Sequence, residues 1–176
     1  MILLYNDYTY TSFQVNGEDV EDGGSITVTA ALTSVEVLLE LTDPDATFEV
    51  SGSDNIVIGT NLITVVVTAA DGSATATYTV TVVVLSNDTS LAEFTVDGSP
   101  VDDGDYFELP LGTTSVEIVV VANDEGATFE IDGGQDLQPG ENTLTVTVTA
   151  ADGETTKEYV VNLFVLLSDD TSLAIF

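Results

Sequence analysis

The chain of 176 residues contains no cysteine, no histidine and no tryptophan, and Lys157 is its only basic residue. Without cysteine, disulfides, thiolate nucleophiles and soft-metal sites are excluded. Without histidine, general acid–base catalysis would fall almost entirely to carboxylates. These carboxylates lie in predicted turns and on outward strand positions, where burial beside a charged partner is not expected. The sequence therefore predicts that the protein is not an enzyme.

Acidic residues dominate the charge of the chain, with 31 Asp and Glu giving a formal net charge of −30 at pH 7. Phosphate backbones and anionic lipid surfaces would be repelled, so nucleic acid is excluded as a partner. No apolar run reaches membrane-spanning length, and Met1–Leu4 lacks the basic region and the length of a secretory signal. Two explanations of the charge stay open: a solvated exterior that resists aggregation, or a surface suited to calcium or a saline medium.

An internal repeat organises the chain. Phe13–Gly17 recurs as Phe94–Gly98, and Ala46–Val50 recurs as Ala127–Ile131, each 81 residues further on. A repeat of about 80 residues is too long for one turn of a solenoid and suits a small independent β-domain.

The offset sets the predicted domain boundaries. We predict one β-sandwich repeat over residues 5–85 and a second over residues 86–167. Residues 1–4 match the end of a repeat, and residues 168–176 match the beginning of one. We therefore interpret them as the tail of a preceding repeat and the first strand of a following repeat.

Apolar and polar residues alternate through short segments rich in valine and threonine, as is typical of half-buried β-strands. We predict strands at 13–15, 26–30, 35–41, 47–50, 62–69 and 74–85, and again at 94–96, 106–109, 116–121, 127–131, 142–150 and 155–166. Residues 52–59 are predicted to be a loop, and a short strand at 56–58 within it stays open as an alternative. In this prediction Phe48, Val50, Tyr78 and the apolar residues of Leu144–Ala150 face the core. The predicted fold class is all-β, with two tandem Ig-like antiparallel β-sandwich domains of about six to seven strands each.

Four segments of the second repeat carry a resemblance to a known group: SLAEFTVDG at 90–98, GTTSVEIVVVA at 112–122, ATFEI at 127–131 and GENTLTVTVTAADGETTKEYVVNL at 140–163. They resemble the bacterial cadherin-like, Ig-like β-sandwich repeats. Such repeats occur in tandem in large surface, adhesin and fibre proteins and in some virion appendages. The resemblance covers essentially all of both units and implies a fold and a tandem arrangement. It transfers no catalytic or ligand residue.

Acidic side chains cluster in several predicted turns, and hard cations such as calcium prefer carboxylate, amide and carbonyl oxygens on loops. The candidate calcium ligands are Asp43, Asp45, Asn87, Asp88, Asp102, Asp103 and Asp105. None has the spacing of an EF-hand loop or reproduces the linker motifs of animal cadherins. The alternative is that acidic turn residues accept hydrogen bonds from their own backbone. Calcium is thus a possible ligand, and no other cofactor is predicted.

The sequence favours a structural repeat module of a long extracellular or cell-surface fibre, filament or adhesin stalk. A virion decoration or appendage protein is the second candidate, and a calcium-stabilised adhesive module is the third. Ser172–Phe176 restates Ser90–Phe94, the opening strand of a repeat. We therefore expect contact with copies of the chain, or with neighbouring repeats, head to tail by strand addition. Membrane insertion is not predicted.

Overall fold

The computed structural model describes residues 6–29 and 32–168, and within them the chain is all-β, as predicted. The terminal fragments expected at 1–4 and 168–176 lie outside the described residues, apart from Ser168, and so does Ala30 of a predicted strand. The chain divides into two compact units, residues 1–86 (unit 1) and 87–176 (unit 2). No helix long and apolar enough to cross a membrane occurs among the residues described.

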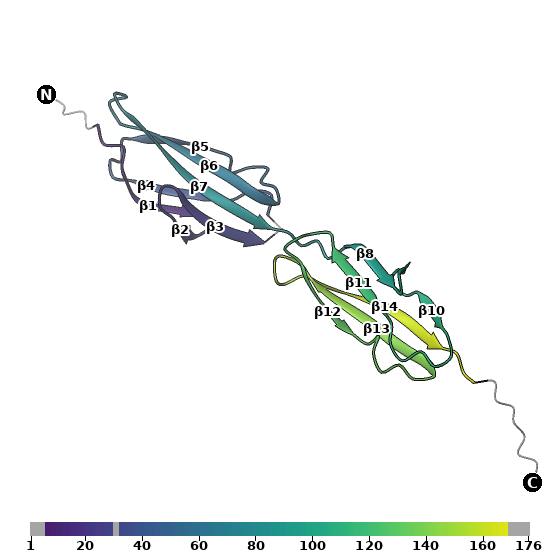
Figure 1. Ribbon diagram of the computed structural model, residues 1–176. Coiled ribbons are helices and arrows are strands. Elements are labelled where there is room, and N and C mark those ends of the chain that lie inside the picture. Colours follow the sequence, from purple (N-terminus) through teal and green to yellow (C-terminus); the bar gives the residue numbers. More distant parts are fainter. Residues whose placement is uncertain (1–5, 30–31, 169–176) are drawn as a thin grey trace, which may run out of the picture. The chain divides into compact units, whose positions relative to one another are not determined.

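Unit 1 is a sandwich of two sheets (Figure 1). Its strands are β1 (Tyr10–Val15), β2 (Glu18–Asp19), β3 (Gly24–Thr29), β4 (Val37–Leu41), β5 (Thr47–Ser51), β6 (Gly59–Thr68) and β7 (Thr75–Leu85). One sheet has the order β2-β1-β4, and the other has the order β3-β7-β6-β5.

Unit 2 repeats this topology strand for strand. Its strands are β8 (Leu91–Val96), β9 (Ser99–Pro100), β10 (Tyr106–Leu109), β11 (Ile118–Ala122), β12 (Thr128–Asp132), β13 (Gly140–Thr149) and β14 (Thr156–Val165). The sheet orders are β9-β8-β11 and β10-β14-β13-β12. The two halves therefore share one strand order, as the constant sequence offset predicts.

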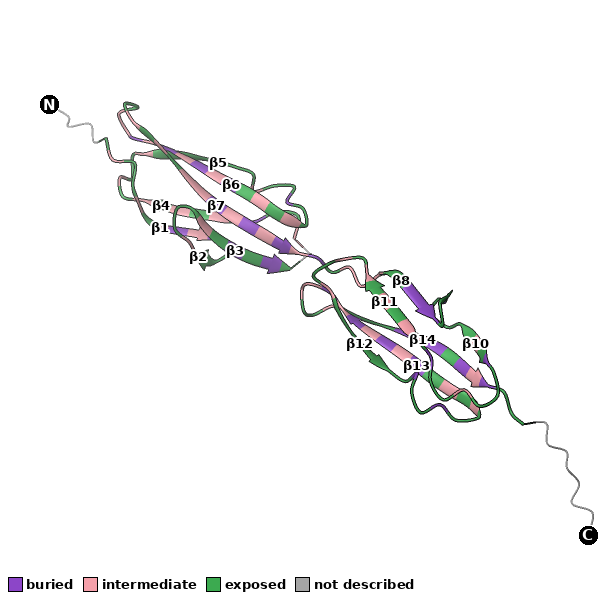
Figure 2. Ribbon diagram, in the orientation of Figure 1, coloured by how far each residue is buried: buried purple, intermediate pink, exposed green. Residues whose placement is uncertain are grey.

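Alternate residues of the long strands make the two cores. Figure 2 shows buried residues alternating with less buried ones along β6, β7 and β13. In β13 the predicted inward residues Leu144, Val146 and Val148 are all fully buried, and Ala150 follows them in the core. Each unit has its own cluster of buried side chains. Burial of one face of each sheet is the main force that holds such a sandwich together.

A two-residue turn closes the hairpin at the start of each unit. Asn16 and Gly17 connect β1 to β2 with φ of 53° and 82°, and Asp97 and Gly98 connect β8 to β9 with φ of 48° and 74°. Positive φ at both central residues marks a type I′ turn, for which Asn-Gly and Asp-Gly are preferred. The turn predicted at Asn16-Gly17 is therefore confirmed.

One strand pair in each unit differs from the antiparallel arrangement that we predicted. β3 runs parallel to β7 from Gly24↔Val80 to Thr29↔Leu85, and β10 runs parallel to β14. The chain leaves the β1–β2 hairpin in one sheet and crosses to the other sheet, where β3 aligns with the last strand. Residue alternation reports which face is buried, not the direction of the neighbouring strand, so the sequence pattern does not reveal this pairing.

The segment Ile56–Ile58 belongs to a loop, as predicted, and the alternative of a short strand there is not found. The side-chain amide of Asn61 takes the place of a neighbouring strand. Its Oδ1 accepts a hydrogen bond from the Val57 N–H at 2.9 Å, and its Nδ2 donates to the Val57 carbonyl oxygen at 2.7 Å. A side chain that satisfies backbone groups in this way removes the need for a ladder.

The inward placement predicted for Phe48 is also wrong, since 39% of its surface is exposed. β5 is the edge strand of the four-stranded sheet, and among the described residues it pairs only with β6. Its neighbour on the same face, Val50, does pack against the core, as predicted. An edge strand can leave alternate residues incompletely covered, and this position is covered only in part.

Candidate functional site

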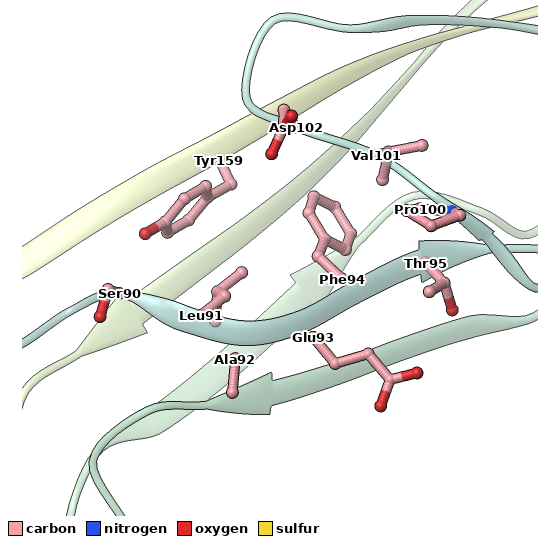
Figure 3. A pocket seen from close by; sticks show the side chains of 10 residues that line it. All are labelled: Ser90, Leu91, Ala92, Glu93, Phe94, Thr95, Pro100, Val101, Asp102 and Tyr159. Atoms are coloured by element: carbon pink, nitrogen blue, oxygen red, sulfur yellow. The ribbon is translucent and has the colours of Figure 1, made fainter.

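A groove lies beside the first strand of unit 2, between β8, the segment after β9 and β14 (Figure 3). Its volume is about 440 Å³. Leu91 and Phe94 face it from β8, Val101 from the segment after β9, and Tyr159 from β14. Its walls are therefore mainly apolar, with acidic residues at the rim.

Tyr159, the tyrosine of this groove, makes contacts through both its ring and its hydroxyl. The ring centroids of Tyr159 and Phe94 are 6.4 Å apart with an interplanar angle of 75°, an edge-to-face packing that aromatic pairs favour. The Tyr159 hydroxyl donates to the Thr89 carbonyl oxygen at 3.0 Å. Lys157 Nζ lies 4.1 Å from the centroid of the same ring, within the range of a cation–π interaction.

Unit 1 has the corresponding groove, of about 710 Å³, between β1 and the segment that follows β2. Tyr10 packs edge-to-face on Phe13 at 5.5 Å and on Tyr78 at 4.9 Å. The Tyr78 hydroxyl donates to the Tyr8 carbonyl oxygen at 2.9 Å, and burial raises the pKa of Tyr78 above its ordinary value. The groove is thus a property of the repeat.

The backbone edge along each groove is only partly paired. β9 pairs with β8 at Thr95 and Val96, and Val101 N–H donates to the Phe94 carbonyl oxygen at 3.0 Å. Within the described ranges, no strand pairs with the same edge of Leu91–Glu93. On the opposite edge of β8, a register shift between Val121 and Ala122 marks a bulge in the ladder with β11. The edge along the groove offers apolar contact and a short row of backbone groups.

The grooves were not predicted from the sequence, because each joins strands that lie far apart along the chain. A usable signal was present, since Phe13 and Tyr78 have identical residues 81 positions later, at Phe94 and Tyr159. Aromatic residues kept at one offset indicate positions that pack in the same way in both repeats.

The structure places the first calcium candidates in separate turns. Asp43 Oδ1 accepts a hydrogen bond from the Asp45 N–H at 3.0 Å. Asp88 Oδ1 accepts one from the Ser90 N–H at 2.8 Å, and the Ser90 hydroxyl and N–H lower the pKa of Asp88 below its ordinary value. Asn87 is exposed. These carboxylates accept backbone hydrogen bonds that order the turns.

The remaining candidates share one turn between β9 and β10. Asp105 Oδ2 accepts from the Asp102 N–H at 2.8 Å, whereas Asp103 Oδ1 accepts from the Val160 N–H on β14 at 2.9 Å. Across residues 6–29 and 32–168, no three Asp or Glu side chains come together as a metal-binding group. Calcium binding therefore stays a prediction from composition.

Thermal melting tests whether calcium binds to the acidic turns. Because the turn carboxylates bind backbone N–H groups, we expect calcium and magnesium at equal millimolar concentration to raise the melting temperature equally over chelator. Both ions would then act by screening the net charge of −30. A rise specific to calcium would instead reveal a site that binds the folded state by mass action.

No family model matches the chain, and no curated protein matches it. Among solved structures, Drosophila N-cadherin EC1-4 is 10% identical with a TM-score of 0.38, over 82% of this chain and 48% of that one. Human protocadherin-24 EC1-2 is 12% identical with a TM-score of 0.37, and the match covers 82% of this chain and 94% of that one. A SusE-like surface located polysaccharide binding protein from Bacteroides thetaiotaomicron is 14% identical with a TM-score of 0.31, over 84% and 34%.

These matches include cadherin extracellular domains, the class of sandwich that the sequence motifs resemble. The chain spans about half of the N-cadherin chain and about a third of the SusE-like chain. A likeness at this identity and TM-score assigns neither a ligand nor a partner to this chain.

Proposed function

We propose that this chain is a structural β-sandwich module of a long extracellular fibre, filament or adhesin stalk. The observation that carries the proposal is that the two units repeat their internal bonds at one offset. The hydrogen bond from Tyr78 to Tyr8 recurs from Tyr159 to Thr89. Such conservation of internal bonds suits a module whose role depends on its shape.

The pairing of β3 with β7 supports a load-bearing role. β3 lies near the beginning of unit 1, and β7 is its last strand. The two run parallel over six register pairs, and β10 and β14 run parallel over four. A pull in opposite directions on the beginning of β3 and the end of β7 would load these hydrogen bonds in shear, so that they resist together. Antiparallel strands pulled from one end would instead separate bond by bond.

The partners in this proposal are copies of the chain or neighbouring repeats, arranged head to tail. The net charge of −30 opposes association of copies at low salt. Screening shortens the range of this repulsion from about 10 Å at 0.1 M to about 3 Å at 1 M salt. Assembly should therefore increase with ionic strength.

Sedimentation velocity and electron microscopy test this expectation. The full chain should form linear assemblies in high salt, and a chain that ends at Leu166 should stay monomeric while keeping its β-sheet circular dichroism. A variant with residues 167–176 in shuffled order keeps length and charge, and it should also fail to assemble. Assembly of the shortened chain like that of the full chain, or a full chain that is monomeric at every salt concentration, would contradict the head-to-tail proposal.

A virion decoration or appendage protein is the second candidate, since the same module would serve there. The genomic neighbourhood distinguishes the virion candidate from the surface fibre. Many further repeats in one reading frame behind a secretory signal would favour the surface fibre. A short reading frame among capsid genes would favour the virion.

A further inference from the structure

One face of unit 2 carries side chains that the repeat does not require. In the four-stranded sheet of unit 2, β10, β14 and β13 are neighbours (Figure 1), and the face in question is the outer face of these three strands. Their register places two rows of three residues across these strands. The rows are Tyr106, Asn162 and Thr143, and next to them Glu108, Phe164 and Glu141.

Two aromatic rings dominate this face. The centroids of Tyr106 and Phe164 are 6.0 Å apart and the rings are inclined by 28°, so the pair is stacked. Tyr106 is nevertheless 59% exposed. A pocket of about 150 Å³ adjoins it, lined in part by Glu141, Thr143 and Asn162. The stacked pair therefore presents aromatic surface beside a small polar hollow.

Two carboxylates flank the aromatic pair. In the register, Glu108 lies on one side of Phe164 and Glu141 on the other. Partial desolvation of the exposed phenol, followed by the charges of Glu108 and Glu141, raises the pKa of Tyr106 above its ordinary value. The face therefore places aromatic surface and two carboxylates side by side.

The six equivalent positions of unit 1 hold none of these groups. At the equivalent positions, one row holds Ser25, Thr81 and Leu62, and the next holds Thr27, Val83 and Thr60. Unit 1 forms the same sheet without an aromatic or a carboxylate there. The aromatic and acidic residues of unit 2 are therefore not demanded by the fold.

We propose that this face of unit 2 binds an organic ammonium group, seated on the Tyr106–Phe164 pair between Glu108 and Glu141. The face of an aromatic ring attracts a cation, and quaternary ammonium ligands are recognised in this way. Paired carboxylates add a direct attraction, and the net charge of −30 concentrates cations near the surface. The proposal holds whether or not the chain belongs to a fibre.

The chain already contains one contact of this kind. Lys157 Nζ lies 4.1 Å from the ring centroid of Tyr159, in the same unit. Tyr106 offers a comparable ring without a cation of its own chain in a described contact. The ammonium could come from a choline head group or from a lysine side chain, and the chemistry is shared.

A titration followed by aromatic ¹H–¹³C NMR tests the proposal on the full chain. Choline chloride should shift the ring signals of Tyr106 and Phe164 in a saturable way, with millimolar affinity as expected for so small a ligand. Sodium chloride at the same ionic strength controls for screening. The neutral isostere 3,3-dimethyl-1-butanol controls for apolar contact. Nα-acetyl-lysine amide, which keeps its ε-ammonium group, represents a lysine side chain. Whether choline or this compound binds more tightly distinguishes the two sources.

Variants that carry the residues of unit 1 at the equivalent positions are expected to fold, so a loss of binding would not reflect unfolding. Tyr106→Ser and Phe164→Val introduce the residues that unit 1 tolerates at these positions. Each should weaken choline binding about tenfold, in the range of a cation–π contact. Glu141→Gln should weaken choline binding severalfold and leave binding of the neutral isostere unchanged, which a merely structural role would not produce.

Three results would overturn the proposal. The first is a shift with choline no larger than that with sodium chloride. The second is equal binding of the neutral isostere, which would describe a plain apolar patch. The third is unchanged choline binding in both Tyr106→Ser and Phe164→Val.

Discussion

Replacing Ile63 by alanine should lower the free energy of unfolding of unit 1 by about 2–5 kcal/mol, because the change removes buried methyl groups and leaves a cavity. Ile63 has no exposed surface and lies in β6, opposite the fully buried Val80 of the neighbouring strand β7. In a unit of about 80 residues, this loss corresponds to a fall in melting temperature of at least about 8 °C. Calorimetry of the full chain would measure it.

The adjacent residue supplies the matched control. Leu62 lies on the same strand, but its side chain is on the other face of the sheet and is 58% exposed. Leu62→Ala removes a side chain of the same size and should change stability by no more than about 0.5 kcal/mol. Equal destabilisation by the two variants would contradict the burial pattern of β6. A loss of structure in unit 2 with Ile63→Ala would show that the cores are coupled, although their clusters are separate.

The contrast between Ile63 and Leu62 shows what a sequence pattern can predict. Alternation reports which face of a strand is buried, and it placed Leu144, Val146 and Val148 in the core correctly. The 81-residue offset predicted a second unit of the same strand order, and the Asn16-Gly17 pair predicted a tight turn. These features depend on local chemistry, so a single sequence contains them.

Features that depend on distant neighbours were missed. The parallel pairing of β3 with β7 joins segments more than 50 residues apart, and alternation is the same for either strand direction. Phe48 has the pattern of a core residue, but its strand lies at the sheet edge. The acidic turns were open to two interpretations because sequence spacing does not show where a carboxylate points. The structure directs Asp103 to the Val160 N–H of another strand.

The aromatic face of unit 2 was missed for a related reason. Tyr106 and Phe164 lie on different strands, and only the register of β10 with β14 brings them together. Comparison of the two repeats would have drawn attention to them, since Ser25 and Val83 occupy the equivalent positions. In a repeated chain, positions that differ between units are therefore a guide to function, as matching positions are a guide to fold.

Replacing Gly133 by alanine should lower the free energy of unfolding of unit 2 by about 2–4 kcal/mol, through backbone strain and overlap together. Gly133 has φ of 96°, a conformation that residues with a side chain rarely adopt. An added Cβ would overlap the carbonyl oxygen of Thr143 and lie 3.1 Å from the Cα of Leu144. Both are backbone atoms of a central strand, so they cannot rotate away. Chemical denaturation would measure the loss.

Gly153→Ala is the control that separates strain from overlap. Gly153 also has a positive φ, of 71°, but an added Cβ there would meet no atom within 4 Å. Its replacement should therefore cost only the conformational penalty of about 1–2 kcal/mol. A loss at Gly153 as large as that at Gly133 would contradict the close approach of β13. Gly52 occupies the equivalent place in unit 1, with φ of 81° and an added Cβ overlapping the Leu62 carbonyl oxygen. The same difference should therefore appear between Gly52→Ala and Gly72→Ala, since Gly72 is equally unobstructed.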